Sequence, residues 1–452
     1  MTQAIGVRLA PSVSMPDRLS ATGIQLALRP LQLLAASPPT LVILALAAML
    51  LRPPDVAFYE IDRWMFGLLV LGVLTRAVAH RQVVSGTTKA SWPMLGLTLL
   101  SVASVSGQNF DAQAWSLIAA KFIVPFTLFH LAGFVFASEK SLRQFETFAL
   151  IALAYLCFTA IAFLAGATSL IFPRFILDPS LGYHADRARG PMLQAVANGV
   201  SINLLALLAL HAFSRGRLKG LKALLLLAAI PVAILATMTR AVWLSFVGMS
   251  IVLALSSHDR RIRCASRAVC VCGLFSVLLL LSFPAPRNAL RDRLRESDPV
   301  AFRQSVYRGS WQMFLERPLA GWGVNQMPSE LARHVRGYGE KELYPHNTYL
   351  ELLTEHGILG FLLYAWLIWK LWTLRRGAAP HSDRNGFLNQ NLRALWPLML
   401  AVYLVNASLV VMNYQFVNGL LFTIAGLLAA QNKQAEEAPS RLRRIGTSEL
   451  KC

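Results

Sequence analysis

The residues best suited to chemistry are four arginines in three separate stretches. Arg187 and Arg189 belong to the run DRARGP at positions 186–191, Arg240 to a short turn between two hydrophobic runs, and Arg303 to a long polar stretch. A guanidinium is always charged, and its planar fork binds phosphate through two parallel hydrogen bonds. A single loop arginine is more often a lipid-headgroup anchor or part of a structural ion pair. Three converging stretches favour a phosphate site instead.

One histidine could move protons. His346 follows Pro345, a residue that suits a helix start, and would lie at the mouth of the hydrophobic run that comes next. Histidine is the side chain best matched to proton transfer near neutral pH. The alternative is an interfacial histidine that bonds a loop carbonyl. His356, deeper in the same run, is interpreted as a packing or hydrogen-bonding residue.

The chain that carries these residues is very apolar. Its 452 residues are 55% hydrophobic and 15% charged, whereas a soluble protein has roughly a quarter of its residues charged and a disordered one far fewer apolar residues. The net charge of +20 could indicate nucleic acid, but a DNA-binding patch needs a soluble face. In a membrane protein the surplus cations set orientation and meet anionic lipid. The composition therefore predicts an all-α polytopic membrane protein with no nucleic-acid partner.

The hydrophobic runs predict about twelve spans, since a spanning helix needs about 20 mostly apolar residues. Pro38 and Pro39 interrupt the first run, and a tight turn at 237–240 divides the continuous hydrophobic sequence from 221 to 257. The expected spans lie near 31–51, 64–79, 92–108, 114–136, 145–168, 190–213, 221–238, 241–257, 266–283, 348–373, 393–411 and 415–431.

Loop charge predicts the orientation, because Lys and Arg are retained on the cytoplasmic side. Alternate short loops are rich in cations, which places both termini in the cytoplasm, and no cleavable signal peptide is expected. The cysteines fall in spans or on the cytoplasmic side, so no disulfide is expected. The expected parts are a cytoplasmic segment at 1–30, nine spans at 31–283, a large external loop at 284–345, three spans at 346–431 and a cytoplasmic tail at 432–452.

The four candidate arginines are exceptions to this charge rule, because they are expected on the external side. Arg187 and Arg189 close one external loop, Arg240 stands in the tight turn, and Arg303 lies in the large loop. Within that loop, residues 299–316 place apolar side chains on one face at helical spacing. This pattern predicts an amphipathic helix that lies on the outer leaflet or covers a cavity.

Several motifs together resemble those of one family. HNTYLE at 346–351 and EHGILG at 355–360 resemble the H-N-x-Y-L-x-x-x-x-E-x-G-I-x-G signature of the bacterial O-antigen ligase and polymerase superfamily. Further elements resemble the family's in the same order: RARGP at 187–191, the Thr-Arg turn at 239–240, and Arg303 followed by PLAGWG at 318–323. One departure is Gln194-Ala195, where many members have an Asn- or His-Pro pair.

The resemblance implies a membrane glycosyltransferase of the C-type (GT-C) fold at the periplasmic face of the bacterial inner membrane. An O-antigen ligase passes O-antigen polysaccharide from undecaprenyl pyrophosphate to lipid A–core oligosaccharide in lipopolysaccharide biosynthesis. The family is thought to invert the anomeric carbon without a metal, and no cofactor is expected. The single large external loop favours a ligase. A polymerase or a protein O-oligosaccharyltransferase would use the same donor, and a lipid-linked glycan transporter is the alternative from another class.

The resemblance also implies roles for the residues. Arg189, Arg240 and Arg303 are expected to bind the pyrophosphate, with Arg187 as an alternate because its spacing to Gly190 matches the family better. His346 is the expected general base. Asn347 or Tyr344 would orient it.

Overall fold

The computed structural model describes residues 37–52, 61–79, 81, 87–106, 109–182, 184–284, 287–288, 291–292, 298–335, 342–377 and 386–449. Every regular element in these ranges is a helix. The α-helices are α2 (Pro38–Leu50), α3 (Ile61–Ala79), α4 (Ser91–Val105), α5 (Ala112–Ile118), α6 (Val124–Val135), α7 (Glu139–Leu164), α8 (Ala195–Ser214), α9 (Gly220–Ala236), α10 (Arg240–Ser256), α11 (Arg260–Ser282), α13 (Asp298–Glu316), α14 (Met327–His334), α15 (Thr348–Thr373), α16 (Gln390–Ala407) and α17 (Gln415–Glu449).

Each of the expected spans overlaps one of these helices or the continuous α5–α6 unit. By length and composition, five segments of the described chain could cross a membrane: 112–135, 139–164, 195–214, 260–279 and 348–376. Four shorter apolar helices accompany them: α2, α4, α9 and α10. The protein is therefore an all-helical membrane protein, while the count of twelve spans and the C-type fold stay predictions.

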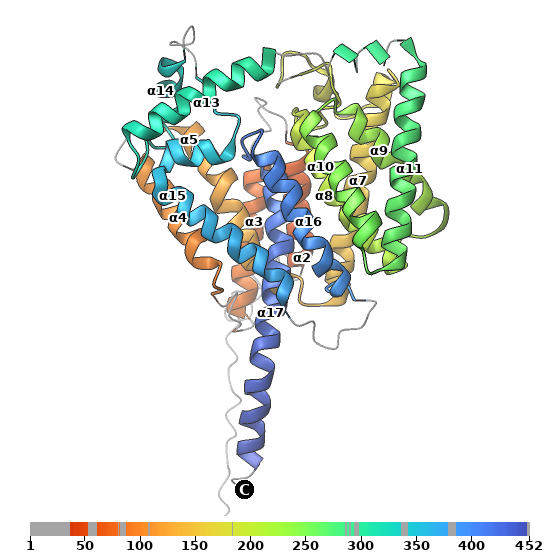
Figure 1. Cartoon of the computed structure of the whole chain (residues 1–452). Coiled ribbons are helices and arrows are strands. Elements are labelled where there is room, and N and C mark those ends of the chain that lie inside the picture. Colours follow the sequence, from red (N-terminus) through yellow and green to blue (C-terminus); the bar gives the residue numbers. More distant parts are fainter. Residues whose placement is uncertain are drawn as a thin grey trace, which may run out of the picture.

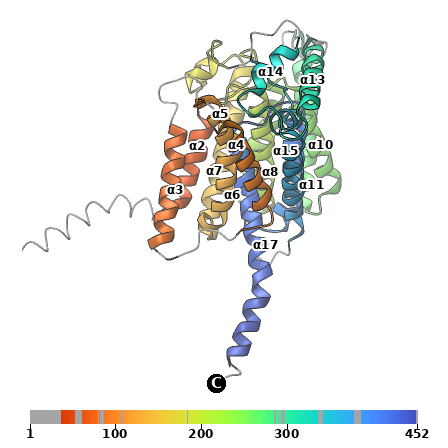
Figure 2. The same cartoon turned by 90° about the vertical axis from the view of Figure 1, so that its left-hand side faces the viewer.

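Two span boundaries differ from those expected. Pro38 and Pro39 begin α2 and do not interrupt it, because a proline in the first helical turn loses no hydrogen bond. The expected residues 31–36 of that span lie outside the described part. At the other end, α17 continues from the last span through the tail to Glu449, and Figures 1 and 2 show it leaving the bundle at the end opposite α13 and α14.

The bundle is apolar inside and outside. Helix α8 is buried over almost its whole length, among α7, α9, α10, α11 and α16. The outward faces of the outer helices carry large apolar side chains that are more than half exposed, among them Leu224, Leu244, Leu255 and Phe275. Such a surface is suited to lipid, because hydrocarbon chains are as apolar as these side chains.

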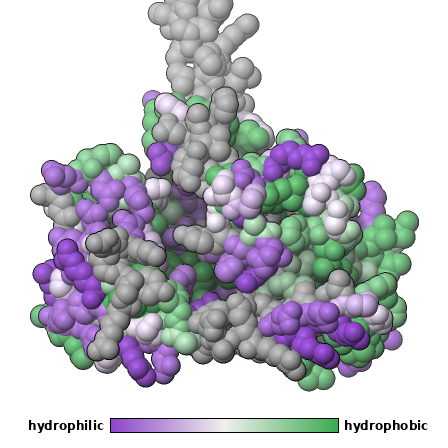
Figure 3. Space-filling model, turned by 90° about the horizontal axis from the view of Figure 1, so that it is seen from above, coloured by the Kyte–Doolittle hydropathy of each residue, from purple (hydrophilic) through white to green (hydrophobic). Residues whose placement is uncertain are grey.

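Helix α13 lies across one end of the bundle (Figure 1) and confirms the predicted amphipathic helix in the large loop. Its Val306 and Met313 are fully buried against α14, in a small core completed by Met327 and Leu331. Figure 3 looks onto this end of the molecule, where hydrophilic residues form patches over much of the surface. A face of this kind is suited to water and not to lipid, and which side of the membrane it faces stays a prediction.

Candidate functional site

His346 stands directly before α15, in a conformation that few residues adopt. Its φ of 50° lies in the left-handed region, and a histidine held there costs free energy that the surrounding structure must offset. Helix α15 begins two residues later, at Thr348, so Pro345 does not start it. The side-chain oxygen of Asn347 instead caps the helix, accepting hydrogen bonds from the amides of Tyr349 at 2.9 Å and Leu350 at 3.2 Å.

Three segments far apart in sequence meet at His346. Its ring packs edge-on against Phe302 of α13, with 6.1 Å between the ring centroids. Burial lowers the pKa of His346, and the positive charges of Arg303 and His184 lower it further. The imidazole is therefore neutral near neutral pH, which is the form that can accept a proton. The sequence reasoning missed His184, although it lies three residues before Arg187 in the same loop.

The loop that carries Arg187 and Arg189 uses the two arginines differently. Arg189 is only 1% exposed. Its Nε donates to the carbonyl of Ile176 at 3.0 Å, and its terminal nitrogens donate to the carbonyls of Leu181 and Asp178. This guanidinium holds the preceding segment in place. The Nε of Arg187 lies 3.5 Å from the carboxylate of Asp186, so this guanidinium faces an acidic side chain.

The Arg187 loop is joined to the turn that carries Arg240. The amide of Ala188 donates to the carbonyl of Ala236, at the end of α9, at 3.1 Å. Arg240 is the first residue of α10, and the Thr239 hydroxyl donates back to the Thr237 carbonyl without capping the helix. A helix N-terminus attracts anions through its amides and its dipole. Arg240 and the start of α10 therefore form a site suited to a phosphate group.

The structure thus brings the expected residues into two linked groups. Arg303 and His346 form one, and the Arg187 loop and the Arg240 turn form the other. His184 connects them, because its carbonyl accepts a hydrogen bond from the Arg187 amide at 3.2 Å. Arg189 lies in the same loop, where each of its three side-chain nitrogens donates to a backbone carbonyl. Asn347 has its side-chain oxygen engaged by the helix cap.

Helix α15 is broken inside the bundle. Gly357 has a φ of 63° and a ψ of −161°, which no helical residue adopts. The loop of residues 318–323 fills the break. The amides of Trp322 and Gly323 donate to the carbonyls of Thr354 and Glu355 at 2.8 and 2.9 Å, and the amide of Ile358 donates to Pro318 at 2.8 Å.

Only glycine fits where this loop meets the break. A Cβ on Gly321 would lie 2.5 Å from the backbone carbon of Glu355, and one on Gly357 would lie 2.3 Å from the carbonyl oxygen of Leu319. The two glycine motifs, PLAGWG and EHGILG, are therefore halves of one joint. The joint fixes the first half of α15, and with it His346, against the loop that follows α13.

A buried charge cluster beneath His346 was missed by the sequence reasoning. Lys121 lies 2.8 Å from a carboxylate oxygen of Glu351 and 3.0 Å from one of Glu355, and all three side chains are buried. Lys121 stands in a short π-helical stretch, Ala119–Ile123, between α5 and α6. The available signal was the presence of ionisable residues inside expected spans, which usually marks a partner or a cavity.

Next to this cluster, His356 has the structural role expected of it. Its Nε2 is hydrogen bonded to the Ser101 hydroxyl of α4 at 3.0 Å, and the residue is fully buried. Tyr344 is fixed from the other side, because its hydroxyl accepts a hydrogen bond from the Gln113 amide at 3.1 Å. The segment around His346 is thus tied to α4 and α5 as well as to α13.

The motifs of the site lie in a part of the chain that is similar to a known protein family. Residues 223–365 match a family model described as O-antigen ligase. The matched interval contains Arg240, Arg303 and His346, together with both halves of the glycine joint. No curated protein matches the chain. The match confirms the resemblance that the motifs predict, because residues 223–365 are similar to the O-antigen ligase family.

Proposed function

We propose that this protein is an O-antigen ligase. It transfers O-antigen polysaccharide from undecaprenyl pyrophosphate to a sugar of the lipid A–core, on the periplasmic face of the bacterial inner membrane, with both termini in the cytoplasm. The observation that carries the proposal is the neutral, half-buried His346 among basic groups, linked through the 184–188 loop to Arg240 at the start of α10.

The chemistry is a displacement at the anomeric carbon of the donor sugar. An acceptor hydroxyl attacks this carbon as its bond to the pyrophosphate oxygen breaks, so that the configuration inverts. The hydroxyl proton passes to the neutral imidazole of His346. The electron pair of the broken bond stays on the pyrophosphate, whose developing negative charge Arg187, Arg240 and Arg303 stabilise. No metal or cofactor enters this scheme.

The geometry supports a revision of the expected arginine roles. Arg187 takes the place at the pyrophosphate that was first assigned to Arg189, because the donors of Arg189 already bind three backbone carbonyls. Asn347 acts through its neighbour: by capping α15 it fixes where the helix starts and so where His346 lies. Asn347 is therefore a positioning residue in this proposal.

The test expresses the His346→Ala variant in a strain that lacks the gene for this protein. Gel banding of the lipopolysaccharide shows whether polysaccharide is still ligated. The expected outcome is a loss of about 10²- to 10⁴-fold in ligation, with normal protein abundance and accumulation of lipid-linked polymer. The matched control is His334→Ala, a histidine of the same loop that bonds the carbonyl of Glu330 and the carboxylate of Glu316. Full ligation by the His346 variant would refute its role as the base. A band of single repeats in the deletion strain would identify a polymerase.

A further inference from the structure

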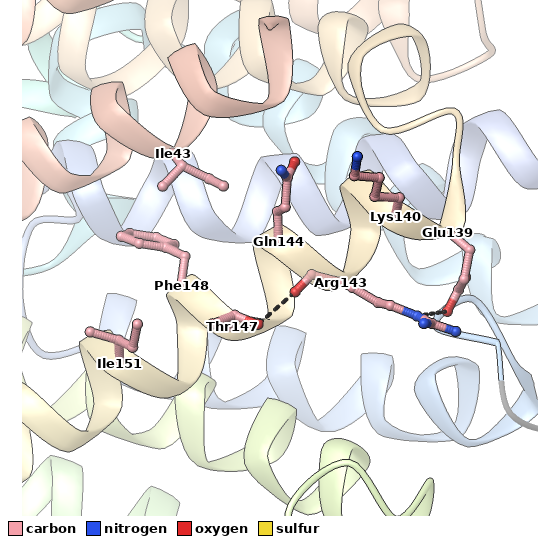
Figure 4. A pocket seen from close by; sticks show the side chains of 8 residues that line it. All are labelled: Ile43, Glu139, Lys140, Arg143, Gln144, Thr147, Phe148 and Ile151. Carbon is pink, nitrogen blue, oxygen red and sulfur yellow. Dashed lines mark hydrogen bonds and ion pairs between the residues drawn. The ribbon is translucent and has the colours of Figure 1, made fainter.

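A second binding surface lies at the end of the bundle opposite α13. A groove of about 700 Å³ runs between α2 and α7. Figure 4 shows Ile43 of α2 facing Phe148 of α7, with the charged side chains gathered at one end of the row. Its lining residues are Ile43, Glu139, Lys140, Arg143, Gln144, Thr147, Phe148 and Ile151.

The groove changes from charged to apolar along α7. Lys140 and Arg143 lie in its first turns, Gln144 and Thr147 follow, and Phe148 and Ile151 form the far end. At a rise of 1.5 Å per residue, Lys140 and Ile151 are about 16 Å apart along the helix axis. One leaflet of a bilayer has a hydrocarbon depth of about 15 Å. The groove therefore has the length and the polarity of one half of a bilayer.

The charged end of the groove is positive. The carboxylate of Glu139 is engaged by Arg215 at 3.0 Å and by the amide of Phe387 at 3.2 Å. Glu146 is paired with Arg215 at 2.7 Å and with Arg217 at 3.4 Å. Both acids are thus matched by arginines of the α8–α9 connection. Lys140 and Arg143 add two charges beyond this balance.

The side chains at both ends of the groove are open to a ligand. Arg143 is 56% exposed, and a long ion pair of 4.0 Å joins its Nε to the carboxylate of Glu139. Ile151, at the apolar end, is 63% exposed, like the other outward-facing apolar side chains of the outer helices. The groove thus pairs two cations at one end with an apolar strip at the other, and a molecule with an anionic headgroup and a hydrocarbon chain would fit both ends.

We propose that this groove binds one anionic phospholipid of the cytoplasmic leaflet. The lipid phosphate lies between Lys140 and Arg143, and an acyl chain runs along Phe148 and Ile151 towards Ile43. Inorganic phosphate would satisfy only the charged end, and a zwitterionic lipid would gain less from the two surplus cations. Gln144 stands where the ester and glycerol oxygens would lie, and its side-chain amide can donate hydrogen bonds to them. The Thr147 hydroxyl donates to the carbonyl of Arg143 at 2.8 Å and so fixes the turn between the two ends of the groove.

The experiment is native mass spectrometry of the full-length protein in detergent, titrated with phosphatidylglycerol, phosphatidylcholine or inorganic phosphate. The wild-type protein is expected to retain phosphatidylglycerol selectively. The double variant Lys140→Gln/Arg143→Gln should bind it roughly thirtyfold more weakly, because each basic residue near an anionic lipid contributes about fivefold. The charge-matched control is Arg81→Gln/Lys89→Gln, two exposed cations in the α3–α4 connection outside the groove.

A second variant tests the apolar half. Ile151→Ser should weaken phosphatidylglycerol binding and leave any phosphate adduct unchanged. Equal retention of phosphatidylcholine, unchanged binding by the Lys140/Arg143 variant, or an equal loss in the Arg81/Lys89 control would overturn the proposal. Binding of phosphate without lipid would also overturn it, since the groove would then be an anion site only.

Discussion

The two charge clusters near the start of α15 are built in opposite ways. Beneath His346, Lys121 faces two carboxylates, and all three side chains are buried from solvent. Around His346 the neighbouring charges are instead of one sign, since Arg303 and His184 both disfavour a proton on it. Buried opposite charges, such as those of Lys121 and the two glutamates, hold the segments that carry them together. Basic groups gathered around a half-buried residue such as His346 repel one another and cost stability. An anion that binds between them offsets this cost.

The largest effect is expected from breaking the closed cluster. Lys121→Met leaves two buried carboxylates without their cation, which should lower the free energy of unfolding by about 3–5 kcal/mol. Thermal unfolding of the purified protein in detergent measures the loss, with Lys89→Met as the control.

The cluster also predicts a rescue. Adding Glu351→Gln and Glu355→Gln to the Lys121 variant removes the uncompensated charge, so most of the lost stability should return. If the triple variant is as unstable as the single one, the lysine acts through packing and not through its charge.

A smaller effect separates the two arginines of one loop. Arg189→Lys cannot reach three carbonyls at once, so it should lower the free energy of unfolding by about 1–3 kcal/mol, at roughly 1 kcal/mol for each hydrogen bond lost. Arg187→Lys should cost less stability than Arg189→Lys and lower ligation, because it keeps the charge facing Asp186 but loses the planar guanidinium fork. Unfolding curves and lipopolysaccharide banding, measured on both variants, test the pair. Reversed results would return Arg189 to the pyrophosphate.

The smallest effect is a shift in pH dependence. Burial, the Arg303 guanidinium and His184 hold the pKa of His346 below its usual value of 6.5. The neutral base therefore persists into mildly acidic solution and is lost as the pH falls through this lowered pKa. Arg303→Gln removes one cause, and the acidic limb of the activity profile should move to higher pH. The control is Arg308→Gln, an exposed arginine on the same helix. An unmoved limb would mean that another group titrates.

Local patterns predicted the helices and the positions of the basic residues. The i, i+3, i+4 spacing at 299–316 was sufficient for α13, because the buried Val306 and Met313 follow the helical period. Hydrophobic runs located the helical ranges for the same reason. Both signals depend only on residues a few positions apart.

The features that the sequence did not reveal depend on contacts between residues far apart in sequence, or on irregular backbone. Lys121 meets Glu355 across 234 positions of sequence, and no periodicity links them. The choice between Arg187 and Arg189 depends on a loop whose path turns at left-handed residues, including Gly182, His184 and Gly190. In such a loop, side-chain direction does not follow from spacing. The π-helical stretch at Lys121 likewise shifts the register in a way that the sequence does not signal.

The break in α15 has a consequence for how the protein is made. A helix with an interruption at Gly357 presents open backbone amides and carbonyls, and hydrocarbon offers nothing to bond them. The 318–323 loop supplies these bonds, and it is synthesised before α15. The loop and the broken helix are therefore stable in a membrane only as a pair. A bulky residue at Gly321 would separate this pair, and we expect less of the protein to accumulate in the membrane than of the wild type, as an immunoblot of the membrane fraction would show.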